Sequence, residues 1–166
     1  MLSRIYKQFL MAMLAILGLV GADAFAQVGP QASVTVSAQV NAACRFQTTL
    51  TASMTIANTG VVIDPALGTQ ATGNTTLTYR CTNGTNPEFQ IDGGGYSAGP
   101  SANVTLQGGV PANTLVASIQ VTSGGAGGGM GVNRTAQIDG TISAAAIDAA
   151  APDAYSQVVL IDIRAQ

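Results

Sequence analysis

QASVTVSAQVNAAC, residues 31–44, carries the most regular pattern in the chain. Apolar and polar residues alternate without interruption from position 32 to position 40, and the apolar set is Ala32, Val34, Val36, Ala38 and Val40. Successive side chains of a β-strand point to opposite faces, so this alternation predicts a strand with one buried face. On the residues alone, the first strand of the chain's own domain is the favoured interpretation.

The first 26 residues have the organisation of a secretory signal peptide. Arg4 and Lys7 precede an apolar run that is short for a membrane anchor, and small residues follow it. We expect cleavage between Ala26 and Gln27, which leaves a mature chain of residues 27–166. No later segment is apolar enough to span a bilayer. The mature chain is therefore expected to be exported and to have no membrane span.

Charge is scarce in residues 27–166. This part of the chain has no lysine or histidine, and its four arginines and seven carboxylates leave a formal net charge of −3. A weakly acidic chain without a basic cluster is not expected to bind nucleic acid or anionic lipid. So few charges also offer little repulsion against self-association, which suits a protein that assembles.

The two cysteines, Cys44 and Cys81, predict one disulfide. An exported chain meets an oxidising compartment, and a bridge between positions 37 apart would stabilise the fold by about 3–4 kcal/mol. A zinc site and a CxxC redox pair are both excluded, because the spacing is wrong and the chain has no histidine.

Short strands separated by turn signals account for most of the remaining sequence. Beyond the alternating segment, strands are predicted at 44–56, 75–81, 88–91, 104–107, 114–122, 135–142 and 155–164. Gly73-Asn74 is interpreted as a turn, the glycine-rich stretch 123–131 as a flexible, solvated hairpin loop, and the alanine-rich stretch 144–154 as mostly loop. The pattern predicts a single all-β domain, an antiparallel sandwich or barrel.

Enzyme chemistry finds little support. The chain has no histidine, and its mature part has no lysine, so Ser-His-Asp, Cys-His and Schiff-base catalytic sites are excluded. Two carboxylate pairs, Asp148 with Asp153 and Glu88 with Asp92, lack the apolar surroundings that raise the pKa of a general acid. Calcium ligation by Asp64, Asp92 or Asp153 has no supporting spacing. We therefore expect neither catalysis nor a cofactor.

The order of several motifs resembles a known family. The motifs are Asn41-Ala42-Ala43-Cys44, Thr78-Tyr79-Arg80-Cys81-Thr82-Asn83-Gly84-Thr85, Phe89-Gln90-Ile91-Asp92-Gly93-Gly94, Ile138-Asp139-Gly140-Thr141-Ile142 and Ala151-Pro152-Asp153-Ala154-Tyr155-Ser156, followed by a terminal apolar strand. Over essentially the whole mature chain, this order resembles the spore coat protein U domain family, which includes the Csu-like pilins of archaic chaperone–usher pili.

The resemblance implies an incomplete immunoglobulin-like β-sandwich that a donated strand completes. Residues 27–40 would be the donor segment and residues 41–166 the sandwich domain, with the donor ending between Val36 and Val40. A periplasmic chaperone would first lend a strand, and an outer-membrane usher would then exchange it for the donor segment of the next subunit. The implied function is a structural subunit of a surface pilus.

Two other functions stay open at this point. The chain could be a secreted coat or matrix component, as the family name suggests, or a carbohydrate-binding sandwich module. Aromatic residues for stacking on sugars are scarce, and the chain has no tryptophan.

Overall fold

The computed structural model describes residues 35–47 and 51–166. The chain divides into two units, Met1–Ala38 and Gln39–Gln166. In the first unit, residues 35–38 lie outside any helix or strand. All elements described below belong to the second unit.

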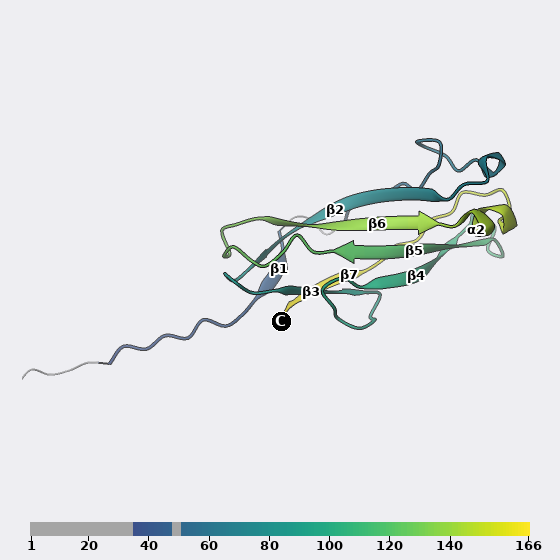
Figure 1. Cartoon of the computed structure of the whole chain (residues 1–166). Coiled ribbons are helices and arrows are strands. Elements are labelled where there is room, and N and C mark those ends of the chain that lie inside the picture. Colours follow the sequence, from purple (N-terminus) through teal and green to yellow (C-terminus); the bar gives the residue numbers. More distant parts are fainter. Residues whose placement is uncertain (1–34, 48–50) are drawn as a thin grey trace, which may run out of the picture. The chain divides into compact units, whose positions relative to one another are not determined.

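The second unit is an all-β, sandwich-like fold with two antiparallel sheets, as predicted (Figure 1). The larger sheet has the strand order β1-β2-β6-β5-β4, and β3 and β7 form a two-stranded sheet. The strands are β1 (Cys44–Phe46), β2 (Ala71–Cys81), β3 (Pro87–Ile91), β4 (Ser101–Gln107), β5 (Thr114–Thr122), β6 (Arg134–Ile142) and β7 (Ile161–Ala165).

Two short helices, η1 (Pro65–Leu67) and α2 (Ala144–Ala149), contact each other near the start of β2. We call this the helical end of the domain. The other end of β2 carries Cys81, and we call it the disulfide end. In Figure 1, α2 marks the helical end of the larger sheet and β1 lies at the disulfide end.

Alternating burial explains why the larger sheet has one apolar face. In β5, Leu115, Ala117, Ile119 and Val121 are buried, and the residues between them are exposed. The bounds of β5 are those predicted, and β3, β4 and β6 differ from their predicted bounds by at most a few residues. The inner face is thus aliphatic, as expected for a sheet half-buried in a sandwich.

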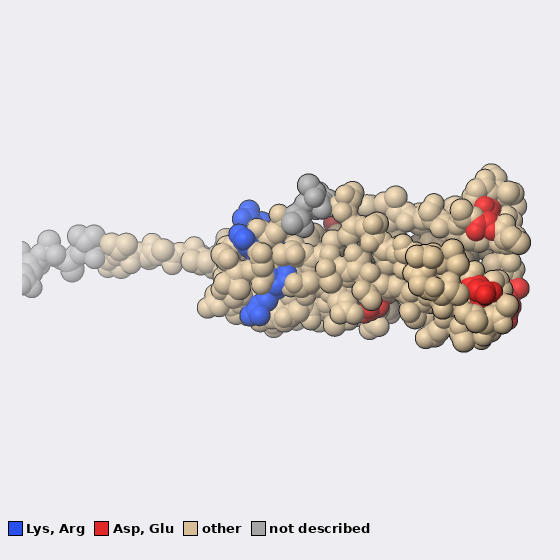
Figure 2. Space-filling view, turned by 90° about the horizontal axis from the view of Figure 1, so that it is seen from above, with Lys and Arg blue, Asp and Glu red and all other residues tan. Residues whose placement is uncertain are grey.

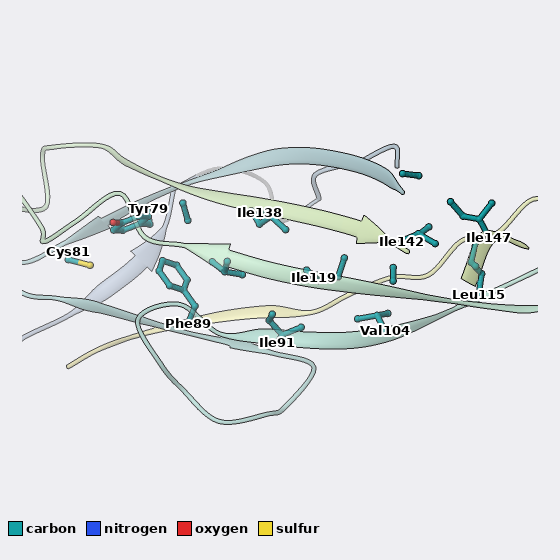
Figure 3. Close-up of a cluster of buried hydrophobic side chains, with 14 residues drawn as sticks. Tyr79, Cys81, Phe89, Ile91, Val104, Leu115, Ile119, Ile138, Ile142 and Ile147 are labelled. Atoms are coloured by element: carbon teal, nitrogen blue, oxygen red, sulfur yellow. The ribbon is translucent and has the colours of Figure 1, made fainter. Parts of the chain in front are cut away.

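The core extends along the inner face of the larger sheet, from Cys81, Tyr79 and Phe89 at the disulfide end to Ile142, Leu115 and Ile147 at the helical end (Figure 3). The ring of Phe89 lies edge-on to that of Tyr79, with a centroid separation of 5.6 Å. The Tyr79 hydroxyl donates a hydrogen bond to the carbonyl of Gly125 at 2.7 Å, so its one polar atom is satisfied in the core. Along the rest of the sheet, the facing layer consists of irregular segments, which define the site described below.

The predicted strand at 44–56 is wrong over most of its length. Among the described residues of this range, only Cys44–Phe46 form a strand, and residues 51–56 have no regular secondary structure. The predicted turn at Gly73-Asn74 is also wrong, because both residues lie inside β2. The two errors have one cause: the backbone of residues 51–56 crosses the inner face of the sheet directly over Gly73.

The alanine-rich stretch forms a helix rather than the predicted loop. The Ser143 hydroxyl accepts a hydrogen bond from the backbone N–H of Ala146, which caps α2 at its start. Ile147 is buried, and this one large apolar side chain attaches the helix to the core. A capped first turn and one buried residue are therefore enough to order this short helix.

The glycine-rich stretch connects β5 to β6 as a hairpin loop, as predicted, but it is only partly solvated: Gly124, Gly125 and Gly131 are exposed, whereas Gly127 is not. Gly127 is buried and exchanges backbone hydrogen bonds with the turn after β2: its carbonyl accepts from Gly84 at 2.9 Å, and its N–H donates to Thr85 at 2.8 Å. The guanidinium of Arg80 donates to the carbonyl of Met130 at 3.2 Å. The stretch is low in side chains because its backbone lies against other backbone.

Candidate functional site: an open apolar groove

A groove of about 1300 Å³ runs along the inner face of the larger sheet. Its floor consists of apolar side chains from β2, β4, β5 and β6, namely Leu77, Leu106, Leu115, Ile119, Ile138 and Ile142. Phe46 of β1 and Ile147 of α2 also line it, near the disulfide end and the helical end respectively. Four of the six, Leu115, Ile119, Ile138 and Ile142, are already buried in the single chain. Thr75 and Thr78 of β2 also line the groove, and no charged side chain of these four strands does.

One wall of the groove is the irregular segment 51–56. It approaches the sheet closely because Gly73 and Gly140 face each other across β2 and β6. The carbonyl oxygen of Thr55 lies 2.1 Å from where a Cβ of Gly73 would be, and the Met54 methyl lies 2.6 Å from the corresponding position of Gly140. Two glycines thus allow this wall to rest directly on the sheet.

The opposite wall is the C-terminal segment, and part of its backbone is unpaired. Ser156 forms two backbone hydrogen bonds with Gln107 of β4, at 3.0 and 2.9 Å. Farther along, β7 is hydrogen-bonded to β3 alone and is an edge strand. Between these points, the backbone groups of residues 157–159 have no hydrogen-bond partner among the described residues. The groove therefore has an open strand edge along one side.

The predicted last strand, 155–164, is shorter than expected. Only Ile161–Ala165 is a strand: Ser156 forms a single bridge with Gln107, and the backbone of residues 157–159 has no partner among the described residues with which to continue a ladder. Its apolar alternation nevertheless persists: Tyr155, Val159, Ile161 and Ile163 pack against the core. This period-two pattern was the sequence signal for the second wall. It predicted a strand but gave no sign that the strand would lack a partner.

Asp153 holds the helical end of this wall in place. One carboxylate oxygen accepts hydrogen bonds from the N–H of Val110 and the side-chain amide of Asn113, both at 3.0 Å. The other accepts from the N–H of Ala154 at 2.8 Å. These bonds, that of Val110 foremost, lower the pKa of Asp153 to about 2. The carboxylate thereby ties the β4–β5 hairpin to the segment that follows α2.

The predicted donor residues are exposed where the structure describes them. Val36 is 89% exposed and Val40 is 81% exposed, Ala38 is also exposed, and none of the three lies in a strand. The structure therefore does not place Val36 or Val40 in the core of the domain. Ala32 and Val34 lie outside the described residues.

The predicted disulfide is confirmed. Cys44 and Cys81 are bonded and are register partners on β1 and β2. The bond fixes the short strand β1 to the sheet a few residues after the alternating segment ends. The predicted cleavage site at Ala26 and Gln27 lies outside the described residues.

Two of the candidate acids, Glu88 and Asp64, have partners within the domain. Glu88 forms a salt bridge with Arg164 at 2.7 Å, and Asp64 caps η1 by accepting from the N–H of Ala66 at 2.9 Å. Within residues 35–47 and 51–166, no three histidine, cysteine, aspartate or glutamate side chains are grouped as a metal site would require.

Comparison of the chain with protein-family models, with curated proteins and with solved structures gives no match. None of the helices in the described ranges is both long enough and apolar enough to cross a membrane. The features that bear on function are therefore the groove, its unpaired edge and the exposed apolar segment.

Proposed function

We propose that this chain is a structural subunit of a bacterial surface pilus and polymerises by donor-strand exchange. In this proposal, residues 32–40 of one copy lie in the groove of the next copy. One observation carries most of the weight: an apolar groove lies beside an unpaired strand edge, in a chain whose alternating apolar residues Val36 and Val40 are exposed. Strand addition to an open sheet edge is a recurrent mode of peptide recognition.

The dimensions of donor and acceptor agree. Nine residues, 32–40, extend over about 30 Å at 3.3 Å per residue. The acceptor edge, residues 157–165, has the same number of residues. Side chains of alternate donor residues would point at the apolar floor, and the backbone would supply the partners that residues 157–159 lack.

Burial supplies a sufficient driving force. Three valines at roughly 1.5–3 kcal/mol each, with two alanines, contribute on the order of 5–10 kcal/mol before ordering costs. Each added backbone hydrogen bond contributes about 1 kcal/mol net. The alternating residues are small, which suits a groove whose other walls are already in place.

The open groove also explains why such a subunit would require a chaperone and an usher. An apolar groove beside an unpaired strand edge can pair with the strands of other chains and so promotes aggregation. A periplasmic chaperone that lends a strand, and an outer-membrane usher where the strand is exchanged, would keep the groove covered between export and assembly. These two partners belong to the proposal and follow from the family resemblance.

A matched pair of substitutions tests the proposal. In a chain beginning at Gln27, Val36→Asp places a charge on the face expected to enter the groove, and Ser37→Asp places the same charge on the opposite face. We expect the Val36→Asp chain to remain monomeric, because burying an unpaired carboxylate is costly. The Ser37→Asp chain should polymerise like wild type. Size-exclusion chromatography and negative-stain electron microscopy measure both.

A second measurement separates donor from acceptor. The Val36→Asp chain keeps its groove, so it should bind a labelled peptide of residues 27–40 in a fluorescence anisotropy assay. Equal polymerisation of the two variants would contradict the proposal, as would a wild-type monomer that binds no peptide. The second result would favour a coat component or a carbohydrate-binding module.

A further inference from the structure

Three of the four arginines of the domain gather at the disulfide end without a carboxylate partner. Arg45 and Arg80 are register partners on β1 and β2, and Arg134 is the register partner of Tyr79. Arg80 donates to neutral acceptors, including the side-chain oxygen of Asn133 at 2.7 Å. Among the described residues the one salt bridge involves the fourth arginine. The disulfide end thus carries three uncompensated positive charges.

Three carboxylates gather at the helical end in the same way. Asp64 precedes η1, Asp148 is exposed on α2, and Asp153 follows α2. Their hydrogen-bond donors are neutral, as for Asp153 with Val110 and Asn113. None of the three forms a salt bridge within the described part of the chain. This end therefore carries three uncompensated negative charges.

The two groups lie at opposite ends of the domain (Figure 2). β2 connects the two ends with 11 residues, a length of about 36 Å at 3.3 Å per residue. The Debye length at physiological ionic strength is about 8 Å, so the charges of one copy cannot neutralise each other. The like charges of Arg45 and Arg80 also repel directly across the strand pair. A partner with the opposite charge would relieve both effects.

A second copy of the chain is such a partner, because it presents an acidic end of equal and opposite charge. A head-to-tail contact between unlike ends repeats indefinitely and forms a fibre. The chain also enters the domain at the basic end: Ala43 and Thr82 are joined by a backbone hydrogen bond of 2.9 Å next to the disulfide. The donor segment therefore leaves the domain from the surface that carries Arg45 and Arg80.

We propose that the basic end of each subunit, formed by Arg45, Arg80 and Arg134, docks on the acidic end of the next copy, formed by Asp64, Asp148 and Asp153. This inference rests on the proposed strand exchange and adds its direction and its specificity. The donor segment enters the neighbouring groove at the helical end, so its last residues lie near Asp153 and its first residues lie toward the disulfide end. It then runs antiparallel to residues 157–165.

Asp148→Arg tests the contact, and Asp139→Arg is its matched control. Both variants change the net charge equally, but Asp139 is opposite Asn74 in the sheet, between the two ends. In about 10 mM salt, where the Debye length is about 30 Å, we expect Asp148→Arg to slow assembly of the full mature chain about 10-fold. Asp139→Arg should slow it less, because its charge lies about 10 Å farther from the docked end, at three residues of 3.3 Å each. In about 1 M salt the two rates should converge.

The peptide of residues 27–40 separates this contact from strand insertion, because it has no charged side chain. Added to acceptor chains carrying Val36→Asp, it should bind equally well with and without Asp148→Arg. Binding to both acceptors, combined with unchanged assembly of the Asp148→Arg chain, would overturn the end-to-end contact alone. Absence of peptide binding to either acceptor would overturn the strand exchange on which it rests.

A double substitution tests whether the two ends meet. Arg45→Glu alone should slow assembly at low salt, as Asp148→Arg does. In the combined variant the new glutamate and the new arginine attract each other, so assembly should be slowed less than the product of the two single effects. A combined effect equal to that product, with intact folding by circular dichroism, would show that the ends act independently and would overturn the proposal.

Discussion

Gly73 and Gly140 show how single residues shape the groove. The sequence suggested a turn at Gly73, because glycine followed by asparagine is a common turn signal. In the structure Gly73 serves a different purpose: it leaves room for the backbone of Thr55 to cross the sheet. The requirement comes from a segment almost twenty positions earlier in the chain, so no local pattern could reveal it.

Substitution of these glycines by alanine should therefore have unequal effects. Gly73→Ala places a methyl group 2.1 Å from the Thr55 carbonyl oxygen, which is backbone and can move only with its whole segment. We expect a loss of about 1–3 kcal/mol in unfolding free energy. Gly140→Ala meets the flexible ends of Met54 and Ile56 instead, so its cost should be smaller.

Gly95→Ala is the control for the two substitutions, because nothing lies within 4 Å of its Cβ position. Its unfolding free energy should stay within about 0.5 kcal/mol of wild type. Urea denaturation followed by circular dichroism measures all three variants. Equal stability of Gly73→Ala and Gly95→Ala would show that the segment around Thr55 does not lie on the sheet.

The elements differ in how well local sequence predicted them. β5 has its predicted bounds, because uninterrupted apolar alternation and a neighbour on each side satisfy both faces and both edges. α2 has no apolar periodicity in its sequence, because Ile147 is its one large apolar residue, and the helix is ordered by the Ser143 cap and the burial of Ile147. The segment before β7 has the apolar pattern of a strand but no ladder, since pairing depends on a neighbour that local sequence cannot specify.

The groove itself follows only in part from the sequence. The disulfide was predicted by residue number and is confirmed, whereas the donor role of residues 32–40 stays a prediction from the alternation and the family resemblance. The two walls were predicted as strands, at 44–56 and 155–164, and not as largely irregular segments, because long-range contacts hold them. The bonds of Asp153 with Val110 and Asn113, about forty positions away, are an example.

The hydrogen bonds that the Asp153 carboxylate accepts make the stability of the domain depend on pH. These hydrogen bonds lower the pKa of Asp153 from 3.8 to about 2, so the stability that they contribute is fully present above about pH 4. This contribution is lost as the pH falls through 2. Asp153→Asn should therefore lower the melting temperature at pH 7, and its difference from wild type should shrink between pH 4 and pH 2.

Thermal melts at pH 7, 4 and 2.5, followed by circular dichroism, measure this difference. Asp148→Asn is the control, because Asp148 is exposed and its carboxylate accepts no hydrogen bond from the described residues. It should melt close to wild type at pH 7. A difference between Asp153→Asn and wild type that stays constant down to pH 2.5 would contradict the role of the ionised carboxylate.

At the scale of the whole molecule, a well-formed sheet does not by itself make a closed sandwich. The larger sheet is well formed, yet its apolar face is covered by a two-stranded sheet at the disulfide end and by irregular chain elsewhere. Residues that would be interior in a closed sandwich, such as Leu77 and Leu106, are only partly buried. Under the proposed strand exchange, the complete fold belongs to two copies of the chain rather than to one.

Amide hydrogen exchange tests this directly, without altering the groove. In the monomeric Val36→Asp chain, the amides of residues 157–159 lack partners and should exchange at nearly the rate of an unfolded peptide. Among these three amides, those that face the added strand should exchange about 100-fold more slowly, or slower still, once the peptide of residues 27–40 is bound. This corresponds to a local opening free energy of roughly 2.7 kcal/mol. Amides in the middle of β5 are paired on both sides and should be protected in both samples. If the peptide binds and residues 157–159 remain fast, the donor fills the groove without joining this edge, and the antiparallel pairing with residues 157–165 is wrong.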